Sequence, residues 1–265
     1  MAFERELETA LGLATLAGVL IKKYYDDGIG HDMKANQTPV TRADIESNEL
    51  IMKGLRASFP DDGIISEELP AVNASHDRIW HIDPLDGTRS FVERAGTFAV
   101  HIGLSVAGKP VLGVVHQPLT QATYSGIVGQ GAYLSMPGNP KQEMAPKHLD
   151  GLVASIDRRK DHEKYIGLFK RIGVTGTAPT GSEGLRIMKV AEGLAHFRIG
   201  DRPTNSWDLC APHAIHLAAG GACCYVENDE PIVYSSDSKM KGTHLLAISR
   251  EVLQLVRKGY KEEGL

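Results

Sequence analysis

The sequence is poor in cysteine, and none of its apolar runs is long. Only three of the 265 residues are cysteine, namely Cys210, Cys223 and Cys224. Three thiols do not make a disulfide framework, so the sequence favours a reducing, cytoplasmic environment. The adjacent Cys223 and Cys224 lie in an apolar stretch, which is more typical of a hydrophobic core than of a metal or redox site.

The N-terminal segment has neither the pattern of a secretory signal nor that of a membrane span. Its apolar run from Ala10 to Ile21 is shorter than the roughly 20 residues that a transmembrane helix needs. Acidic residues Glu4, Glu6 and Glu8 stand where a signal peptide carries positive charge. We therefore expect no membrane partner and predict a buried amphipathic helix from Phe3 to Tyr25.

Charge of one sign is not concentrated anywhere in the chain. The formal net charge is -4, which is mildly acidic and argues against a surface for a nucleic acid polymer. The eleven histidines are scattered without a spacing that indicates a metal site. The length suffices for a sizeable core in one domain or in two intimate subdomains.

An apolar segment that ends in acids organises the rest of the prediction. Residues 79–91 read IWHIDPLDGTRSF, and the first four are typical of a buried strand. Pro84 lacks the backbone N–H that a sheet ladder needs as a donor, so the strand is predicted to end near Asp83. His81 lies within the strand and is expected to be buried and hydrogen-bonded, not catalytic.

Two carboxylates and a predicted helix start follow this strand. Asp83 and Asp86 stand close together, Gly87 permits a tight turn, and Thr88 or Ser90 is a candidate helix cap. Acids at a strand end beside a helix N-terminus suit a hard cation with an anion pocket next to it. An ordinary surface turn is the alternative for this segment alone, because Asp, Pro and Gly are common turn residues.

Two further acids stand at the edges of apolar segments far apart in the sequence. Glu67 ends a short predicted strand, and Glu68 points the other way if that strand continues. Asp208 lies in the first turn of a predicted helix, where an acid is commonplace. With Asp83 and Asp86 they supply four carboxylates to a single predicted site.

The second predicted helix begins with an acid that has two plausible roles. Thr41 is a candidate N-cap, and Asp44 follows three residues later, as in a capping box. Support of the helix start is the role that the position itself indicates for Asp44. Activation of an attacking water is the other role, and it is implied only by the family resemblance given below.

The remaining pattern predicts an antiparallel meander followed by a mixed second half. The expected strands are 97–106, 111–116, 122–128, 132–134, 152–155 and 195–199, with a final hairpin over 226–234. The expected helices, besides the first, are 41–58, 161–172, 182–193, 207–219 and 251–260.

Three motifs in this order make the sequence resemble the inositol monophosphatase superfamily. They are Glu67-Glu68, the segment WHIDPLDGT at residues 80–88, and Trp207-Asp208 followed by Ala211 and Gly220-Gly221. The resemblance implies the superfamily's α+β fold, a layered α/β sandwich of two intimate subdomains. It also implies a magnesium-dependent, lithium-sensitive phosphatase that uses two or three Mg²⁺ ions per active site.

The resemblance implies how the acids are used. Glu67, Asp83 and the carbonyl of Leu85 are expected on one Mg²⁺ ion. Asp83, Asp86 and Asp208 are expected on another. Such a pair of cations holds both the attacking and the leaving oxygen of a phosphate ester.

The resemblance also implies the residues around the reacting phosphate. Thr88, with Asp44 or Glu67, is expected to orient a metal-activated water. The expected substrate contacts are Asp86, Gly87, Thr88, Gly181, Ser182 and Asp208. A helix N-cap is the alternative role of Ser182.

A polar, proline-containing stretch from Met136 to Leu149 is the predicted linker between the two halves. Residues 1–145 are expected to form an N-terminal α+β subdomain with the metal motifs. Residues 146–265 are expected to form a C-terminal α/β subdomain that closes over the substrate.

The segments around Asp83, Lys109 and Asp208 look most like the 3'(2'),5'-bisphosphate nucleotidase branch of the superfamily. That branch removes the 3'-phosphate of adenosine 3',5'-bisphosphate. An inositol monophosphatase or another sugar-phosphate phosphatase is the alternative, and a catalytically idle regulator that binds metal or nucleotide is a third. In each case the partner is a small-molecule phosphate ester, and the chain is a monomer or a homodimer.

Four bases are available for a second phosphate, although exposed and solvated side chains are their default interpretation. They are Lys34, Arg89, Arg198 and Arg202. His213 and His216 lie three residues apart on the predicted helix of Asp208, and substrate contact is the lesser expectation for them.

Overall fold

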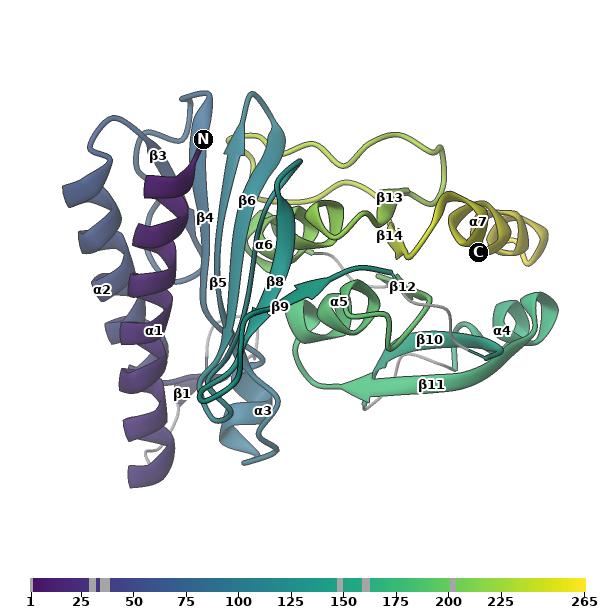
Figure 1. The fold of residues 1–265 in the computed structure, drawn as a ribbon, viewed down its shortest axis with the longest axis horizontal. Coiled ribbons are helices and arrows are strands. Elements are labelled where there is room, and N and C mark those ends of the chain that lie inside the picture. The colour runs from purple at the N-terminus through teal and green to yellow at the C-terminus, as the bar shows by residue number, and fades with distance from the viewer. Residues whose placement is uncertain (1, 29–31, 34–38, 147–149, 159–162, 201–203) are drawn as a thin grey trace.

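Two large β-sheets, a small two-stranded sheet and three layers of helices make up the structure, a computed structural model (Figure 1). It describes residues 2–28, 32–33, 39–146, 150–158, 163–200 and 204–265. Helices α1 and α2 lie on the outer face of a larger sheet, α5 and α6 pack between the two sheets, and α4 and α7 pack together beside the smaller one. The expected layered α+β fold is confirmed.

The larger sheet has seven strands in the order β3-β4-β5-β6-β7-β8-β9. β3 runs parallel to β4, and every later neighbour is antiparallel, which confirms the predicted meander. Its strands are β3 (Gly63–Ser66), β4 (Arg78–Asp86), β5 (Ala99–Val106), β6 (Lys109–Gln117), β7 (Ala122–Ile127), β8 (Gly131–Ser135) and β9 (Gln142–Met144).

The last strand of this sheet lies in the stretch that was predicted to be a linker. Met144 of β9 is buried and pairs with Ala132 of β8. A prediction of a linker across the whole stretch is therefore wrong. The polar residues there are typical of a short edge strand, which has one side exposed to solvent.

The smaller sheet has five strands in the order β11-β10-β12-β14-β13. They are β10 (Leu152–Asp157), β11 (Val174–Thr180), β12 (Phe197–Ile199), β13 (Ala222–Tyr225) and β14 (His244–Ala247). The predicted hairpin over 226–234 is wrong, because β13 pairs with β14 and the residues between them form a long connection. A two-stranded sheet of β1 (Asp32–Met33) and β2 (Pro39–Val40) completes the strands.

The helices agree with the predicted order, with one clear difference in length. They are α1 (Glu4–Asp27), α2 (Arg42–Ser58), α3 (Thr88–Val92), α4 (Ile166–Ile172), α5 (Glu183–Ala191), α6 (Ser206–Ala218) and α7 (Arg250–Glu262). α4 begins at Ile166, later than predicted, and positions 161–162 lie outside the described residues. None of the described helices is both long and apolar enough to cross a membrane.

Strand β4 continues through Pro84, which corrects the predicted end at Asp83. The pairing with β5 shifts here: Asp83 faces His101, and Asp86 faces Ala99, so β4 has one residue more than its partner. Side chains three residues apart in a regular strand point to opposite faces. The extra residue of this bulge turns Asp83 and Asp86 to the same face, and Pro84 lies where the ladder is interrupted.

Helix α6 packs directly on the backbone of the larger sheet at a pair of glycines. Gly103 of β5 and Gly113 of β6 are cross-strand partners. A Cβ at Gly103 would lie 2.6 Å from the amide nitrogen of Ala211, and one at Gly113 would lie 2.1 Å from its carbonyl oxygen. These two glycines let α6 approach closely enough for its first turn to reach the end of β4.

Candidate active site

Three carboxylates from two elements meet at the end of β4. Oxygen atoms of Asp83, Asp86 and Asp208 all lie within 4.8 Å of one another. Asp83 and Asp86 come from the bulged end of β4, and Asp208 comes from the first turn of α6. The structure therefore brings together three of the four acids predicted to share a site.

Asp83 is almost completely buried, and one of its oxygens bonds to the backbone. Its Oδ1 accepts a hydrogen bond of 2.9 Å from the N–H of Leu85. Burial, followed by the charges of Glu67, Asp86 and Asp208, raises the pKa of Asp83 well above its usual range. Positive charge brought close to Asp83 would favour its ionised form.

Asp208 is held by the start of its own helix. The N–H of Asn205 donates to Asp208 Oδ2 at 2.7 Å, as part of a capping box. Burial, followed by the charges of Glu67 and Asp86, raises the pKa of Asp208 well above its usual range. The commonplace role of a helix-start acid is therefore present, and the same carboxylate also faces the other acids.

Asp86 joins the larger sheet to helix α5. Its Oδ2 accepts hydrogen bonds from the hydroxyl of Ser182 and, at 2.8 Å, from the N–H of Gly184. His101 Nε2 lies 3.2 Å from the same oxygen. Burial acts to raise the pKa of Asp86, but His101, Ser182 and the Gly184 amide outweigh it and lower that pKa.

Asp44 and Thr88 form a hydrogen-bonded pair beside this group. Asp44 is fully buried, and its Oδ2 accepts hydrogen bonds from the N–H of Thr41 at 2.8 Å and the Thr41 hydroxyl at 2.7 Å, which confirms the predicted capping box. The Thr88 hydroxyl lies 3.1 Å from Asp44 Oδ1 and 3.1 Å from the carbonyl oxygen of Leu85. Burial, only partly offset by the hydrogen bonds, raises the pKa of Asp44 to about 6.

Thr88 does not cap the short helix α3, and neither does Ser90. The residue before α3 is Gly87, whose left-handed backbone has φ of 92°. A side chain is strained at that angle, so glycine suits this turn. The Thr88 hydroxyl instead points back to Asp44 Oδ1.

Glu67 directly follows β3 and lies beside the three acids without belonging to the tight group. Its N–H donates to the carbonyl of Ile82 at 3.2 Å, which anchors it next to β4. Its charge raises the pKa values of Asp44, Asp83 and Asp208. Glu67 is therefore close enough to add to the same negative field.

The remaining predicted contacts, Gly181 and Ser182, lie where α5 meets the larger sheet. A Cβ at Gly181 would lie 2.2 Å from Ser90 Oγ and 2.4 Å from Thr97 Oγ1, so close packing excludes a side chain there. Ser182 accepts from the N–H of Leu185 at 3.1 Å, which confirms its role as an N-cap. Its hydroxyl also donates to Asp86.

The donors of this site fit a hard divalent cation. All are carboxylate or carbonyl oxygens, which Mg²⁺ prefers to nitrogen or sulfur ligands. Burial, followed by repulsion from neighbouring acids, raises the pKa values of Asp83 and Asp208, and a cation close to them would relieve that repulsion. The residues present therefore fit the expected metal.

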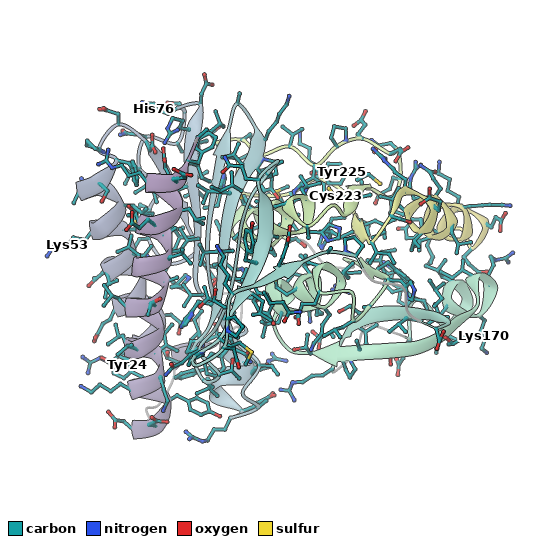
Figure 2. All side chains as sticks on the ribbon, viewed as in Figure 1. Tyr24, Lys53, His76, Lys170, Cys223 and Tyr225 are labelled. Carbon is teal, nitrogen blue, oxygen red and sulfur yellow. The ribbon has the colours of Figure 1, made fainter. Side chains whose placement is uncertain are left out.

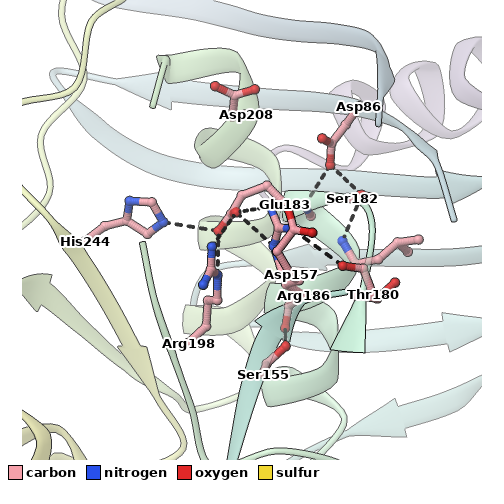
Figure 3. A network of polar contacts seen from close by, with 12 residues as sticks. Asp86, Ser155, Asp157, Thr180, Ser182, Glu183, Arg186, Arg198, Asp208 and His244 are labelled. Carbon is pink, nitrogen blue, oxygen red and sulfur yellow. Dashed lines mark hydrogen bonds and ion pairs between the residues drawn. The ribbon is translucent and has the colours of Figure 1, made fainter. Parts of the chain in front are cut away.

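A buried ion network lies next to the acids, and the sequence did not predict it (Figure 3). Glu183 accepts hydrogen bonds from Arg186, Arg198 and His244, and Arg186 also pairs with Asp157 at 2.8 Å. Burial acts to raise the pKa of Glu183, but the two arginines and His244 lower it well below its usual range.

This network corrects one of the expectations for a second phosphate. Arg198 was expected to be exposed, but its side chain is 2% exposed and bonds to Glu183 at 3.0 and 3.1 Å. Arg89 is exposed, as expected. Lys34 and Arg202 lie outside the described residues.

His81, His213 and Cys223 contact other protein side chains, in agreement with the expectation that they lie outside the site. His81 is fully buried between the hydroxyls of Ser206 and Ser105, each at 2.9 Å. His213 contacts Tyr234 and Cys223, and Cys223 and Tyr225 belong to β13 at the edge of the smaller sheet (Figure 2). The cysteines form no disulfide.

The layered fold, the acids at the end of β4 and the match to a family model together identify the class of protein as a phosphatase. A model of the inositol monophosphatase family matches residues 3–255, and the chain belongs to this family.

Individual relatives show the same likeness. The chain is 38% identical over 219 residues to the 3'(2'),5'-bisphosphate nucleotidase CysQ of Escherichia coli K12, covering 81% of this chain and 88% of that protein. It is 29% identical over 261 residues to a histidinol-phosphatase of Chlorobaculum parvum, covering 97% of this chain and 98% of that one. The crystal structure of CysQ from Bacteroides thetaiotaomicron superimposes with a TM-score of 0.81 at 29% identity, covering 94% of this chain and 99% of that one.

Proposed function

We propose that the protein is a magnesium-dependent 3'(2'),5'-bisphosphate nucleotidase that removes the 3'-phosphate of adenosine 3',5'-bisphosphate. The observation that carries the metal chemistry is the close group of Asp83, Asp86 and Asp208, of which the first two are buried. The substrate is supported by the 38% identity to a protein named for that activity.

In this proposal the acids hold two or three Mg²⁺ ions. Glu67, Asp83 and the Leu85 carbonyl serve one ion, and Asp83, Asp86 and Asp208 serve another. When bound, Mg²⁺ neutralises phosphate charge and lowers the pKa of water. The carboxylates fix the position of that charge at the face shared by β4 and α6.

Asp44 and Thr88 orient the attacking water. The Thr88 hydroxyl donates to Asp44 Oδ1, so the lone pairs of the Thr88 oxygen can accept a hydrogen bond from water. The raised pKa of Asp44, about 6, brings this carboxyl closer to neutral pH than an exposed aspartate and suits a group that takes up a proton. The amides of Gly87 and Thr88 and the Gly181–Ser182 segment are proposed to contact the substrate.

The test is phosphate release from three esters: adenosine 3',5'-bisphosphate, inositol 1-phosphate and histidinol phosphate. Each is measured with Mg²⁺, with a chelator in its place, and with added Li⁺. Preference for the nucleotide that depends on Mg²⁺ and falls with Li⁺ is the expected result. Preference for one of the other esters would leave the metal proposal standing and refute the substrate.

A catalytically idle regulator is the remaining alternative, and a binding measurement separates it. Calorimetric binding of Mg²⁺ and nucleotide without phosphate release from any of the three esters would favour it over the enzyme. Sedimentation of the same samples decides between a monomer and a homodimer.

A further inference from the structure

A histidine that the sequence did not mark as functional faces the acids. His101 lies on β5, has no exposed surface, and points to the face covered by α5 and α6. Its Nε2 atom lies 3.2 Å from Asp86 Oδ2. Among the described residues, neither ring nitrogen has a partner with full hydrogen-bond geometry, and the contact with Asp86 Oδ2 is an ion-pair distance. Asp86 is therefore the polar group that the buried ring contacts.

The neighbouring helix is shaped around this ring. A Cβ at Gly184 would lie 2.1 Å from His101 Nε2, so the imidazole occupies the space that a side chain at that position would need. The N–H of the same glycine donates to Asp86 Oδ2. The ring, the glycine and the carboxylate thus fit together at one point between β5 and α5.

We propose that His101 is a positioning residue that orients Asp86 toward the cation. In this arrangement Nε2–H donates to Asp86 Oδ2, and Nδ1 carries no proton. The opposite tautomer would direct a lone pair at the carboxylate and bury an unpaired N–H donor, which is the costlier defect.

The bulge in β4 explains why this contact exists. His101 is the register partner of Asp83, yet its side chain contacts Asp86. Because the extra residue turns both acids to one face, the ring can hold Asp86 beside Asp83. Ser182 and Gly184 hold the Asp86 side chain against helix α5, whereas His101 holds it against the neighbouring strand β5. Partners of this kind commonly set the orientation of a metal-binding carboxylate.

This inference rests on the proposed metal site, and the experiment separates the two. Mg²⁺ alone is titrated calorimetrically into the wild type, His101→Leu, His101→Gln and His101→Asn, and kcat is measured for each. The amide of glutamine can place a donor near the position of Nε2, whereas that of asparagine is one methylene shorter. We expect Mg²⁺ affinity to fall about 10–100-fold in the Leu and Asn variants and to be largely retained in Gln.

His116 supplies a matched control on the opposite face of the same sheet. It is also a buried histidine with one hydroxyl contact, to Thr123 at 2.8 Å, and it packs against Gly18 of α1. His116→Gln is expected to bind Mg²⁺ like the wild type. Thermal unfolding is measured for every variant, and Mg²⁺ affinities are compared only between variants that are folded.

Each outcome supports one statement and overturns another. Equal Mg²⁺ affinity and turnover in the Gln and Asn variants would refute the role of His101 while the metal site stands. A wild-type protein that binds no Mg²⁺ would refute the proposed metal site itself. If His101→Leu does not fold, the comparison of Gln with Asn still decides, because these two differ in reach and not in chemistry.

Discussion

Helix α6 is expected to shift when Gly113 gains a side chain. In Gly113→Ala the new Cβ would lie 2.1 Å from the carbonyl oxygen of Ala211, which is backbone and cannot rotate away. Reaching an ordinary contact moves the helix by about 1 Å, and overpacking of this kind costs about 1–3 kcal/mol. Asp208 lies one turn before Ala211, so its carboxylate moves relative to Asp83.

The expected consequence is a loss of turnover larger than the loss of stability would suggest. A displacement of about 1 Å in a catalytic arrangement lowers the rate by about 100-fold. The assay is kcat at saturating Mg²⁺ and substrate, together with urea unfolding to show that the protein is folded under assay conditions.

Gly126→Ala is the matched control for this substitution. Its Cβ would lie 3.0 Å from the Cβ of Ala218, in the last turn of α6 and far along the helix from Asp208. It is expected to cost some stability and to leave kcat close to the wild-type value. Wild-type kcat and Mg²⁺ affinity in folded Gly113→Ala would refute the idea that the glycine pair sets the position of Asp208.

Three further predictions concern charge. Asp86→Asn is expected to abolish turnover and keep the fold, because the amide oxygen still accepts the hydrogen bond from the Gly184 N–H. Asp86→Ala is expected to lose stability as well, because that N–H then has no acceptor in the side chain. Near-normal turnover in Asp86→Asn would contradict the metal assignment. For Asp44, the folded-state pKa of about 6 lies above the usual 3.8, so the folded state binds this proton more tightly and metal-free stability falls as pH rises through about 6. Urea unfolding with a chelator should show Asp44→Asn gaining about 1 kcal/mol on the wild type between pH 5 and pH 8, and a pH-independent difference would contradict this. Glu183→Gln is expected to cost about 3–5 kcal/mol, since two buried arginines lose the charge of Glu183, although Arg186 keeps its pair with Asp157. Glu93→Gln, which breaks an exposed pair with Arg158, should cost little, and equal losses would show that the buried network is not the cause.

The acids of the site could be predicted because each stands at a point where local sequence fixes the geometry. Asp44 and Asp208 are the third residues of their helices, where a carboxylate caps the backbone. Glu67 follows a short apolar strand. The spacing of Asp83 and Asp86 was recognisable as a pattern, but the bulge that makes both face one side depends on pairing with β5. Pairing is a property of two strands, so one strand's sequence does not reveal it.

The features that were missed all depend on contacts between distant segments. A single histidine in the apolar strand around His101 reads as a buried residue, and only the approach of α5 makes it a neighbour of Asp86. Arg198 reads as a solvated base until Glu183 is placed beside it. The polar stretch that contains β9 gave no strand pattern, because an edge strand of three residues is stabilised by its partner β8.

Each of the four aspartates of the site has one carboxylate oxygen that is held by the backbone. One oxygen of each accepts a backbone N–H, and the donors are Thr41 for Asp44, Leu85 for Asp83, Gly184 for Asp86 and Asn205 for Asp208. The side-chain entropy that a flexible acid would lose on binding, about 0.5–1.5 kcal/mol for each, is thus already lost when the chain folds. A cation that binds as proposed would therefore find ligands whose torsions are already set. On the proposed metal site, the backbone contacts that hold these acids would then be the same with and without the cation.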